Sequence, residues 1–102
     1  MVRPIPMPPM GILPPPQVTE ECIVLGDSLQ IDFGADGIFW SVPQGHFNYK
    51  DLPAYSGIPV KNGVPFDTGV STKTGDVALV YFDQEDGYVY ICIVTIADAC
   101  PP

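Results

Sequence analysis

Positive charge and long apolar runs are the two features that this 102-residue chain has least of. Its 4 lysine and arginine residues stand against 12 aspartate and glutamate residues, which gives a formal net charge of -8. Nucleic acids and anionic membranes attract cationic surfaces, so the charge argues against both as the main partner. No run approaches the roughly eighteen apolar residues of a membrane span, and the N-terminal segment lacks the apolar core of a secretion signal. We therefore expect a protein that is made and kept in a cytoplasm, or in a particle assembled there.

Cysteine and histidine are also scarce, which argues against a metal centre. The three cysteines, Cys22, Cys92 and Cys100, form no C-x-x-C pair, and His46 is the only histidine. This is a poor set of zinc ligands. The odd count and the lack of a signal segment predict reduced thiols. Cys22 and Cys92 lie in apolar strand patterns and are expected to be small buried hydrophobic residues, whereas Cys100 is expected to be exposed.

Recognisable catalytic motifs are missing as well. Ser56 has Ala54 and Ile58 where a nucleophile elbow needs glycines, and no glycine-rich phosphate motif is present. The acidic segment 83–86 lacks the spacing of a calcium loop and is typical of a solvated turn. We expect neither an enzyme nor a protein with a cofactor or a metal.

Proline, by contrast, is abundant at one end of the chain. Residues 1–17 contain seven of the thirteen prolines and a single charged side chain, Arg3. Proline fixes φ and removes the backbone donor, so this segment is predicted to be an extended polyproline II arm rather than part of a sheet. Its apolar side chains are expected to bind a partner, and they are Ile5, Met7, Met10, Ile12 and Leu13.

Residues 18–102 are predicted to form one all-β domain, a small antiparallel β-sandwich or barrel. Apolar residues alternate with a period of two, and glycine and proline recur too often for long helices. Residues 28–33 and 38–42 are expected to pair as a hairpin, and Asn62-Gly63 predicts a second hairpin within 58–66, with prolines at a sheet edge. The clearest hairpin joins residues 77–82 to 88–96. Helix is limited to a turn or two near 49–52.

The last hairpin is apolar on both faces. Half-buried antiparallel sheets usually keep one face polar, so a second apolar face requires a cover. Val89 and Ile91 lie on this second face and are predicted to bind a partner. The cover could be a wrapped edge of the opposite sheet, a neighbouring subunit or another protein. Self-association, most simply as a homotrimer, is expected.

The aromatic residues leave a second function open. Tyr49, Tyr55 or Trp40 could stack on a sugar, which would make the chain a carbohydrate- or ligand-binding β-module on a fibre or an enzyme. Tyrosine is also common in strands and at interfaces, and Trp40 beside Phe39 is expected in the core. The arm favours the structural alternative, because apolar side chains between prolines suit a groove on a partner.

An extended proline-rich arm ahead of a small acidic β-domain resembles the cement or decoration proteins of tailed-phage capsids. The resemblance rests on residues 1–17 and on the hairpin that begins at Gly75-Asp76-Val77-Ala78-Leu79-Val80 and ends at Ile96. It implies a non-enzymatic structural protein on the exterior of the virion, assembled in the host cytoplasm. It also implies a homotrimer bound to a major capsid protein, and no catalytic residues.

Overall fold

The computed structural model describes residues 15–49 and 52–101, and these residues form strands, turns and loops without a helix. The all-β prediction is therefore confirmed. Residues 50 and 51 of the predicted helical turn near 49–52 lie outside the described residues, and at its ends the Leu52 N–H donates to the Tyr49 carbonyl at 3.1 Å. Residues 1–14 of the predicted arm lie outside the described residues. The seven strands are β1 (Gln17–Val24), β2 (Gln30–Ile31), β3 (Gly37–Val42), β4 (Ile58–Val60), β5 (Phe66–Asp67), β6 (Gly75–Asp83) and β7 (Val89–Ala97).

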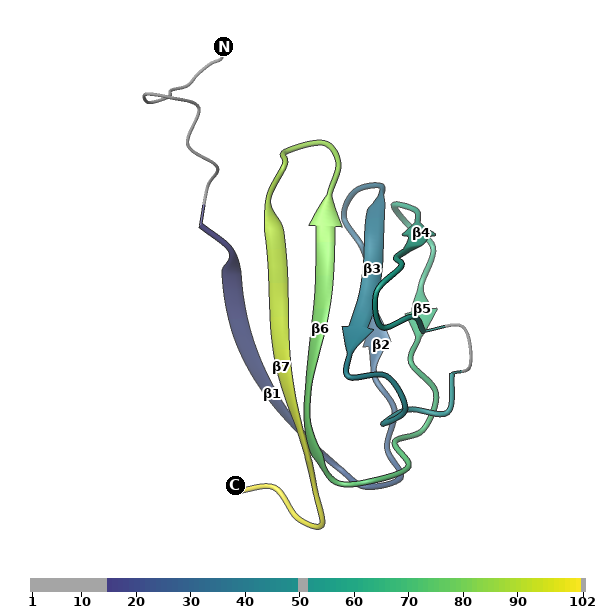
Figure 1. The fold of residues 1–102 in the computed structure, drawn as a ribbon, viewed down its shortest axis with the longest axis vertical. Helices are drawn as coiled ribbons and strands as arrows, with labels where there is room; N and C mark the ends of the chain where they lie inside the picture. Colours follow the sequence, from purple (N-terminus) through teal and green to yellow (C-terminus); the bar gives the residue numbers. More distant parts are fainter. Residues whose placement is uncertain (1–14, 50–51, 102) are drawn as a thin grey trace.

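Five strands form one mixed sheet in the order β1-β7-β6-β3-β4 (Figure 1). The predicted last hairpin is confirmed as β6 and β7, which pair from Gly75↔Ile96 to Phe82↔Val89. Its acidic connection is a turn, as expected. The Asp83 carboxylate accepts the backbone N–H groups of Glu85 and Asp86 at 2.8 and 3.2 Å, so at least this charge has a structural role.

The prediction of a purely antiparallel sheet is wrong at β1. This strand pairs with β7 in parallel, from Gln17↔Tyr90 to Val24↔Ala97. Parallel neighbours need a long crossover, and here nearly the whole domain separates the two strands. A strand pattern specifies which side chains share a face, but it does not specify the direction of a partner that lies far away in the sequence.

Both of the other predicted hairpins are wrong in their pairing. β3 pairs with β6 and β4, whereas β2 pairs with β5 in a separate two-stranded sheet. The turn at Asn62-Gly63 does form, since Gly63 has φ +81° and the Val64 N–H donates to Lys61. This turn joins β4 in one sheet to β5 in the other. Pro59 lies on β4, at the edge of the large sheet, as its lack of a donor predicts.

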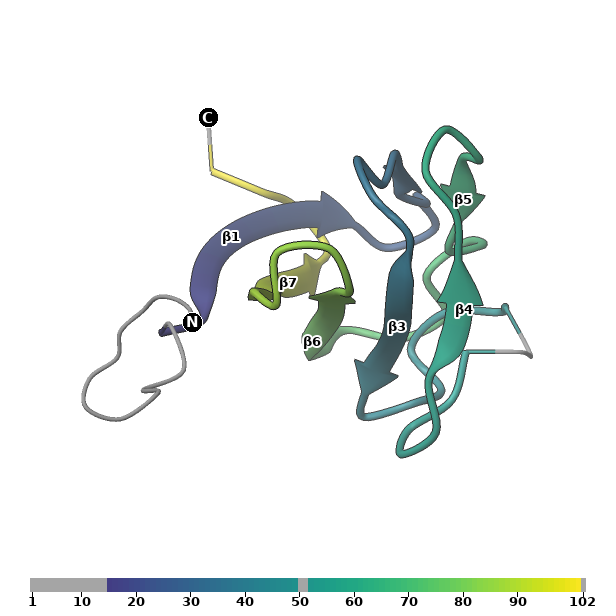
Figure 2. The same ribbon diagram turned by 90° about the horizontal axis from the view of Figure 1, so that it is seen from above.

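The small sheet and the loops around it cover one face of the large sheet, and the core lies between the two layers (Figure 2). Phe39 and Val77 of the large sheet meet Phe33 and Phe66 of the second layer in this core. Within the described ranges the large sheet runs openly from β1 to β4 and does not close into a barrel. The domain is thus two layers of unequal size.

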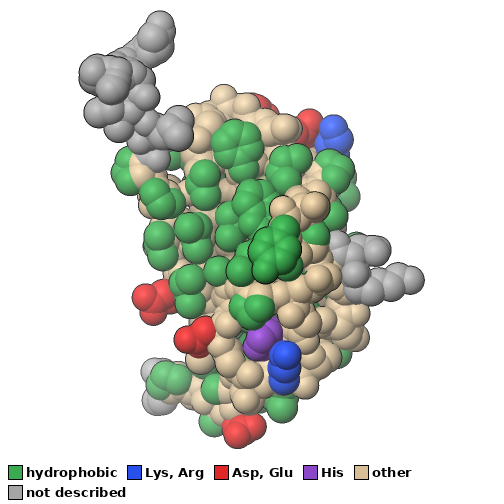
Figure 3. Space-filling model, viewed as in Figure 1, with side chains coloured by type: hydrophobic (Ala, Val, Ile, Leu, Met, Phe, Trp, Pro, Cys, Tyr) green, Lys and Arg blue, Asp and Glu red, His purple; other side chains and the backbone are tan. Residues whose placement is uncertain are grey.

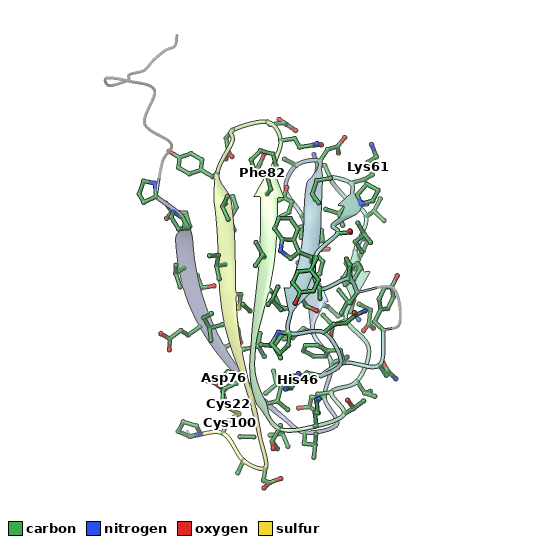
Figure 4. All side chains as sticks on the ribbon, in the orientation of Figure 1. Cys22, His46, Lys61, Asp76, Phe82 and Cys100 are labelled. Carbon is green, nitrogen blue, oxygen red and sulfur yellow. A yellow bond between two sulfur atoms is a disulfide. The ribbon has the colours of Figure 1, made fainter. Side chains whose placement is uncertain are left out.

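A disulfide joins Cys22 on β1 to Cys100 in the C-terminal tail, with Cα atoms 5.9 Å apart (Figure 4). The prediction of three reduced thiols is wrong for this pair, and neither Cys22 nor Cys100 takes the place expected for it. The parallel register explains the bond, because Cys22 lies opposite Thr95 and the tail turns back beside β1. Cys92 is a free, half-buried thiol, close to what was expected.

Candidate functional site

The face of the large sheet that points away from the core is apolar, and we call it the outer face. Strand alternation places on it every second residue of four neighbouring strands. Val80 lies at its centre, opposite Ile91 on β7 and Trp40 on β3. Its apolar members include Val18, Val24, Ile38, Trp40, Val42, Ala78, Val80, Phe82, Val89, Ile91, Ile93 and Ala97.

In the described part of the chain, the C-terminal tail reaches this face at its margin, where Cys100 bonds to Cys22, and no element covers the centre of this face around Val80. Its side chains shield one another, so most are half-buried and none is fully buried, while Val18 is 58 % exposed. Hydrophobic side chains accordingly spread over β1, β7, β6 and β3 in Figure 3. Charge is confined to the margin, where Glu20 lies on the edge strand and Asp76 accepts a hydrogen bond from the Thr95 hydroxyl at 2.9 Å. Contiguous apolar surface of this kind is typical of an interaction site.

The structure brings together the two predicted contact residues of the domain. Val89 lies opposite Phe82 and Ile91 opposite Val80, all on the outer face. The other five predicted contact residues lie outside the described residues, and they are Ile5, Met7, Met10, Ile12 and Leu13.

The sequence predicted Trp40 in the core, and this prediction is wrong. Its neighbour Phe39 is 2 % exposed and faces the core, so the alternation of β3 turns Trp40 to the outer face. There its ring lies beside Gly57, whose missing side chain leaves room for Trp40 and Ile38. The period of two through Ile38-Phe39-Trp40 was the signal that could have identified this position.

The three aromatic residues considered for sugar stacking do not share a surface. Tyr49 packs on Phe66 at 4.9 Å between ring centroids, on the core side of β3, whereas Trp40 faces the opposite side. Tyr55 is 96 % exposed in the loop before β4. The arrangement therefore lacks a common stacking platform made of these residues.

A pocket that sequence reasoning missed lies between the two layers. It has a volume of about 430 Å³ and is enclosed by β1, β7 and β6 on one side and by residues 29–34 on the other. Three aromatic rings form a row along it. The centroids of Phe33 and Tyr81 are 4.7 Å apart, and those of Tyr81 and Tyr90 are 5.8 Å apart with nearly parallel planes. Only the three-dimensional packing of residues 29–34 against β6 and β7 could have revealed this row.

Hydrogen bonds hold two of these rings in place. The Tyr81 hydroxyl donates to the Ala35 carbonyl at 2.6 Å, and the Tyr90 hydroxyl donates to the Asp86 carboxylate at 3.1 Å. Burial, and then the carboxylates of the hairpin loop, raise the pKa of Tyr81. Burial, and then the bond to Asp86, raise the pKa of Tyr90. Both phenols are therefore neutral donors at physiological pH.

Reactive groups do not gather at either surface. Within residues 15–49 and 52–101, no three His, Cys, Asp or Glu side chains are placed to hold a metal ion. The pKa of His46 is lowered, first by burial and then by the charge of Lys73, and its Nδ1 has no hydrogen-bond partner. The described chain also has no helix of the length and apolarity needed to cross a membrane.

In comparisons with known proteins, no family model, no curated protein and no solved structure matches this chain.

Proposed function

We propose that this chain is a non-enzymatic structural protein that binds and stabilises a protein assembly through the outer face of its large sheet. The observation that carries the proposal is the uncovered apolar centre of that face, formed by Trp40, Val80, Phe82 and Ile91. A sheet apolar on both faces is stable in water only when a second layer covers it. The described chain supplies one layer, so another protein chain supplies the other.

The proposed cover is the same face of neighbouring copies, in a homotrimer whose three outer faces turn toward one axis. Closed symmetric assemblies of this kind bury one patch repeatedly and leave no apolar surface exposed. The β-sandwich or barrel that the sequence analysis expected within one chain then arises between chains. Flat sheet faces with aromatic and β-branched side chains, such as Trp40, Phe82 and Ile91, suit the apolar centre of an interface.

The concrete form that we propose is a decoration protein on the exterior of a tailed-phage capsid, with the major capsid protein as its partner. A chain with a net charge of -8 suits a repeated surface position, because like charge discourages uncontrolled aggregation. The arm, outside the described residues, would tie each copy to its surroundings. The alternative, a carbohydrate- or ligand-binding module, is supported by the exposed Tyr55 and by the aromatic-lined pocket between the layers.

The substitution Val80→Asp tests the proposal. Val80 is only half-buried in the single chain, so an aspartate there stays solvated and the domain folds. In the assembly it becomes a buried, unpaired charge that costs about 3–5 kcal/mol. Light scattering should give the mass of a trimer for the unchanged chain and a smaller mass for Val80→Asp.

Val64→Asp is the matched control, because Val64 is 58 % exposed in the β4–β5 turn and away from the outer face. It should leave the trimer intact. Co-sedimentation with intact particles from the cells that produce the chain tests the capsid partner. A chain that is monomeric in solution and on its partner would refute the proposed interface.

A further inference from the structure

We propose that the pocket between the two layers binds the proline-rich arm of a second copy of this chain, so that arms link neighbouring subunits. The occupant is the apolar part of residues 4–13, which precede β1. The proposal rests on the proposed function only in treating the chain as part of an assembly. Its evidence comes from the pocket on the core side of the large sheet, and not from the outer face.

The pocket has the chemistry that proline-rich segments bind. Such segments dock in grooves lined by aromatic rings, because flat rings pack against proline and leave its carbonyls free to accept hydrogen bonds. Phe33, Tyr81 and Tyr90 supply a row of rings, and Leu29 and Leu79 supply apolar walls. The bonds from Tyr81 to Ala35 and from Tyr90 to Asp86 orient two of the rings before any ligand arrives. A volume of about 430 Å³ lies within the usual range of ligand sites, about 300–1,000 Å³.

The arm has the complementary chemistry. Between its prolines it carries Ile5, Met7 and Met10, and its one charged side chain is Arg3. The rim of the pocket is acidic, because Glu21 and Asp32 are exposed lining residues, while the buried Asp83 lines it further in. An apolar segment led by one cation therefore matches an aromatic channel with a negative rim. The chain has 4 basic residues among 102, and no other segment of its sequence combines an apolar, proline-rich run with a leading cation.

The route of the chain favours a second copy over the chain's own arm. Gln17 begins β1 and already lines the pocket, so the arm starts at the pocket's margin. Pro15 and Pro16 precede it without a turn, and Pro14 extends the run to three prolines. Three consecutive prolines favour an extended course for about 9 Å, which carries the arm away from the pocket that lies beside β1. A neighbouring copy's pocket needs no such reversal.

Complementation between two full-length variants tests this inference. Both carry Val80→Asp, so that the outer face does not join copies whatever its role is. The acceptor also carries Ile5→Asp, Met7→Asp and Met10→Asp, which leave its pocket open and its arm unable to bind. The donor carries Thr19→Trp, which fills its own pocket from an exposed position on β1 and leaves its arm intact.

In a titration of isotope-labelled acceptor with unlabelled donor, we expect NMR shifts of the amides of Glu21, Tyr81 and Tyr90. Thr19→Trp in the acceptor should weaken this binding at least tenfold, whereas Val18→Trp should not, because Val18 lies on the opposite face of the same strand. Arg3→Glu in the donor should weaken it severalfold at low salt.

Two results would overturn the inference. One is the absence of shifts at millimolar donor. The other is a pocket already occupied by its own arm, seen as concentration-independent shifts between the Val80→Asp chain and the acceptor. Because every chain in the titration carries Val80→Asp, neither result depends on whether the outer face forms a trimer.

Discussion

Gly37 fits the sequence pattern of a tight turn, but in the structure it is a strand residue that allows close packing. The run Gly34-Ala35-Asp36-Gly37 favours a tight turn, but Gly37 is the first residue of β3 and lies opposite Asp83 on β6. A Cβ atom at Gly37 would clash with the Phe82 carbonyl oxygen and with the ring of Tyr81. Glycine inside a strand often marks such a close approach, and here it makes room for the Tyr81 ring.

Gly37→Ala should therefore destabilise the domain. Overpacking of a tight site typically costs about 1–3 kcal/mol, and here the backbone of Phe82 is one of the obstructing groups and cannot simply rotate away. Urea unfolding followed by circular dichroism measures the change. Gly34→Ala is the matched control, because a Cβ there meets nothing within 4 Å and its φ is not positive, so the two substitutions should differ by at least 1 kcal/mol. Equal stability of the two variants would contradict the packing role.

β1 receives little support from the core for its length. Ile23 is its one buried side chain, and the strand lies at the edge of the sheet with β7 as its only neighbour. Its attachment therefore depends on backbone pairing with β7 and on the disulfide between Cys22 and Cys100. Since β1 also lines the pocket through Gln17, Thr19 and Glu21, this bond determines whether that wall of the pocket stays in place.

Removal of the disulfide by Cys22→Ser should release β1 more readily than any other strand of the large sheet. The closed loop has a sequence separation of 78, for which the chain-entropy model gives a stabilisation of about 4 kcal/mol. Hydrogen exchange should show faster exchange at the β1 amides, with β6 changed less. Cys92→Ser removes a thiol that forms no disulfide and should leave β1 protected. Full protection of β1 in Cys22→Ser would mean that pairing with β7 is sufficient.

The elements that the sequence predicted well are those whose partner is adjacent in the chain. β6 and β7 were predicted as a hairpin because Val77 to Phe82 and Tyr88 to Ile96 flank one short turn. The sequence did not predict the pairing of β1, β2 and β4. Their partner strands are far away in the sequence, and a local pattern carries no information about a distant partner. The disulfide and the pocket share this cause: the disulfide depends on the β1–β7 pairing, and the pocket depends on that pairing and on the packing of residues 29–34 against the large sheet. The outer face was predicted at Val89 and Ile91 because alternation alone defines it.

At the scale of the whole molecule, two opposing contributions act on association between copies. Each copy carries a net charge of -8, so approaching copies repel one another. The proposed attraction is apolar contact between outer faces, whose centre around the described residues Val80 and Phe82 contains no charged side chain. Salt screens the repulsion but leaves the apolar contact in place, because hydrophobic burial does not depend on Coulomb attraction.

Self-association through the outer face should therefore strengthen as salt is added. Between 0.01 M and 1 M ionic strength the Debye length falls from about 30 Å to about 3 Å, so repulsion between whole copies is nearly abolished. Sedimentation velocity at a fixed protein concentration should show the trimer fraction rise over this range, while the acceptor variant, which carries Val80→Asp and an arm unable to bind, stays monomeric throughout. The proposed binding of the arm to the pocket should instead weaken modestly as salt is added. Salt screens the attraction between Arg3 and the acidic pocket rim, whereas the apolar contacts of the arm persist. A trimer that dissociates as salt is added would mean that ionic contacts, rather than the apolar sheet face, hold the copies together.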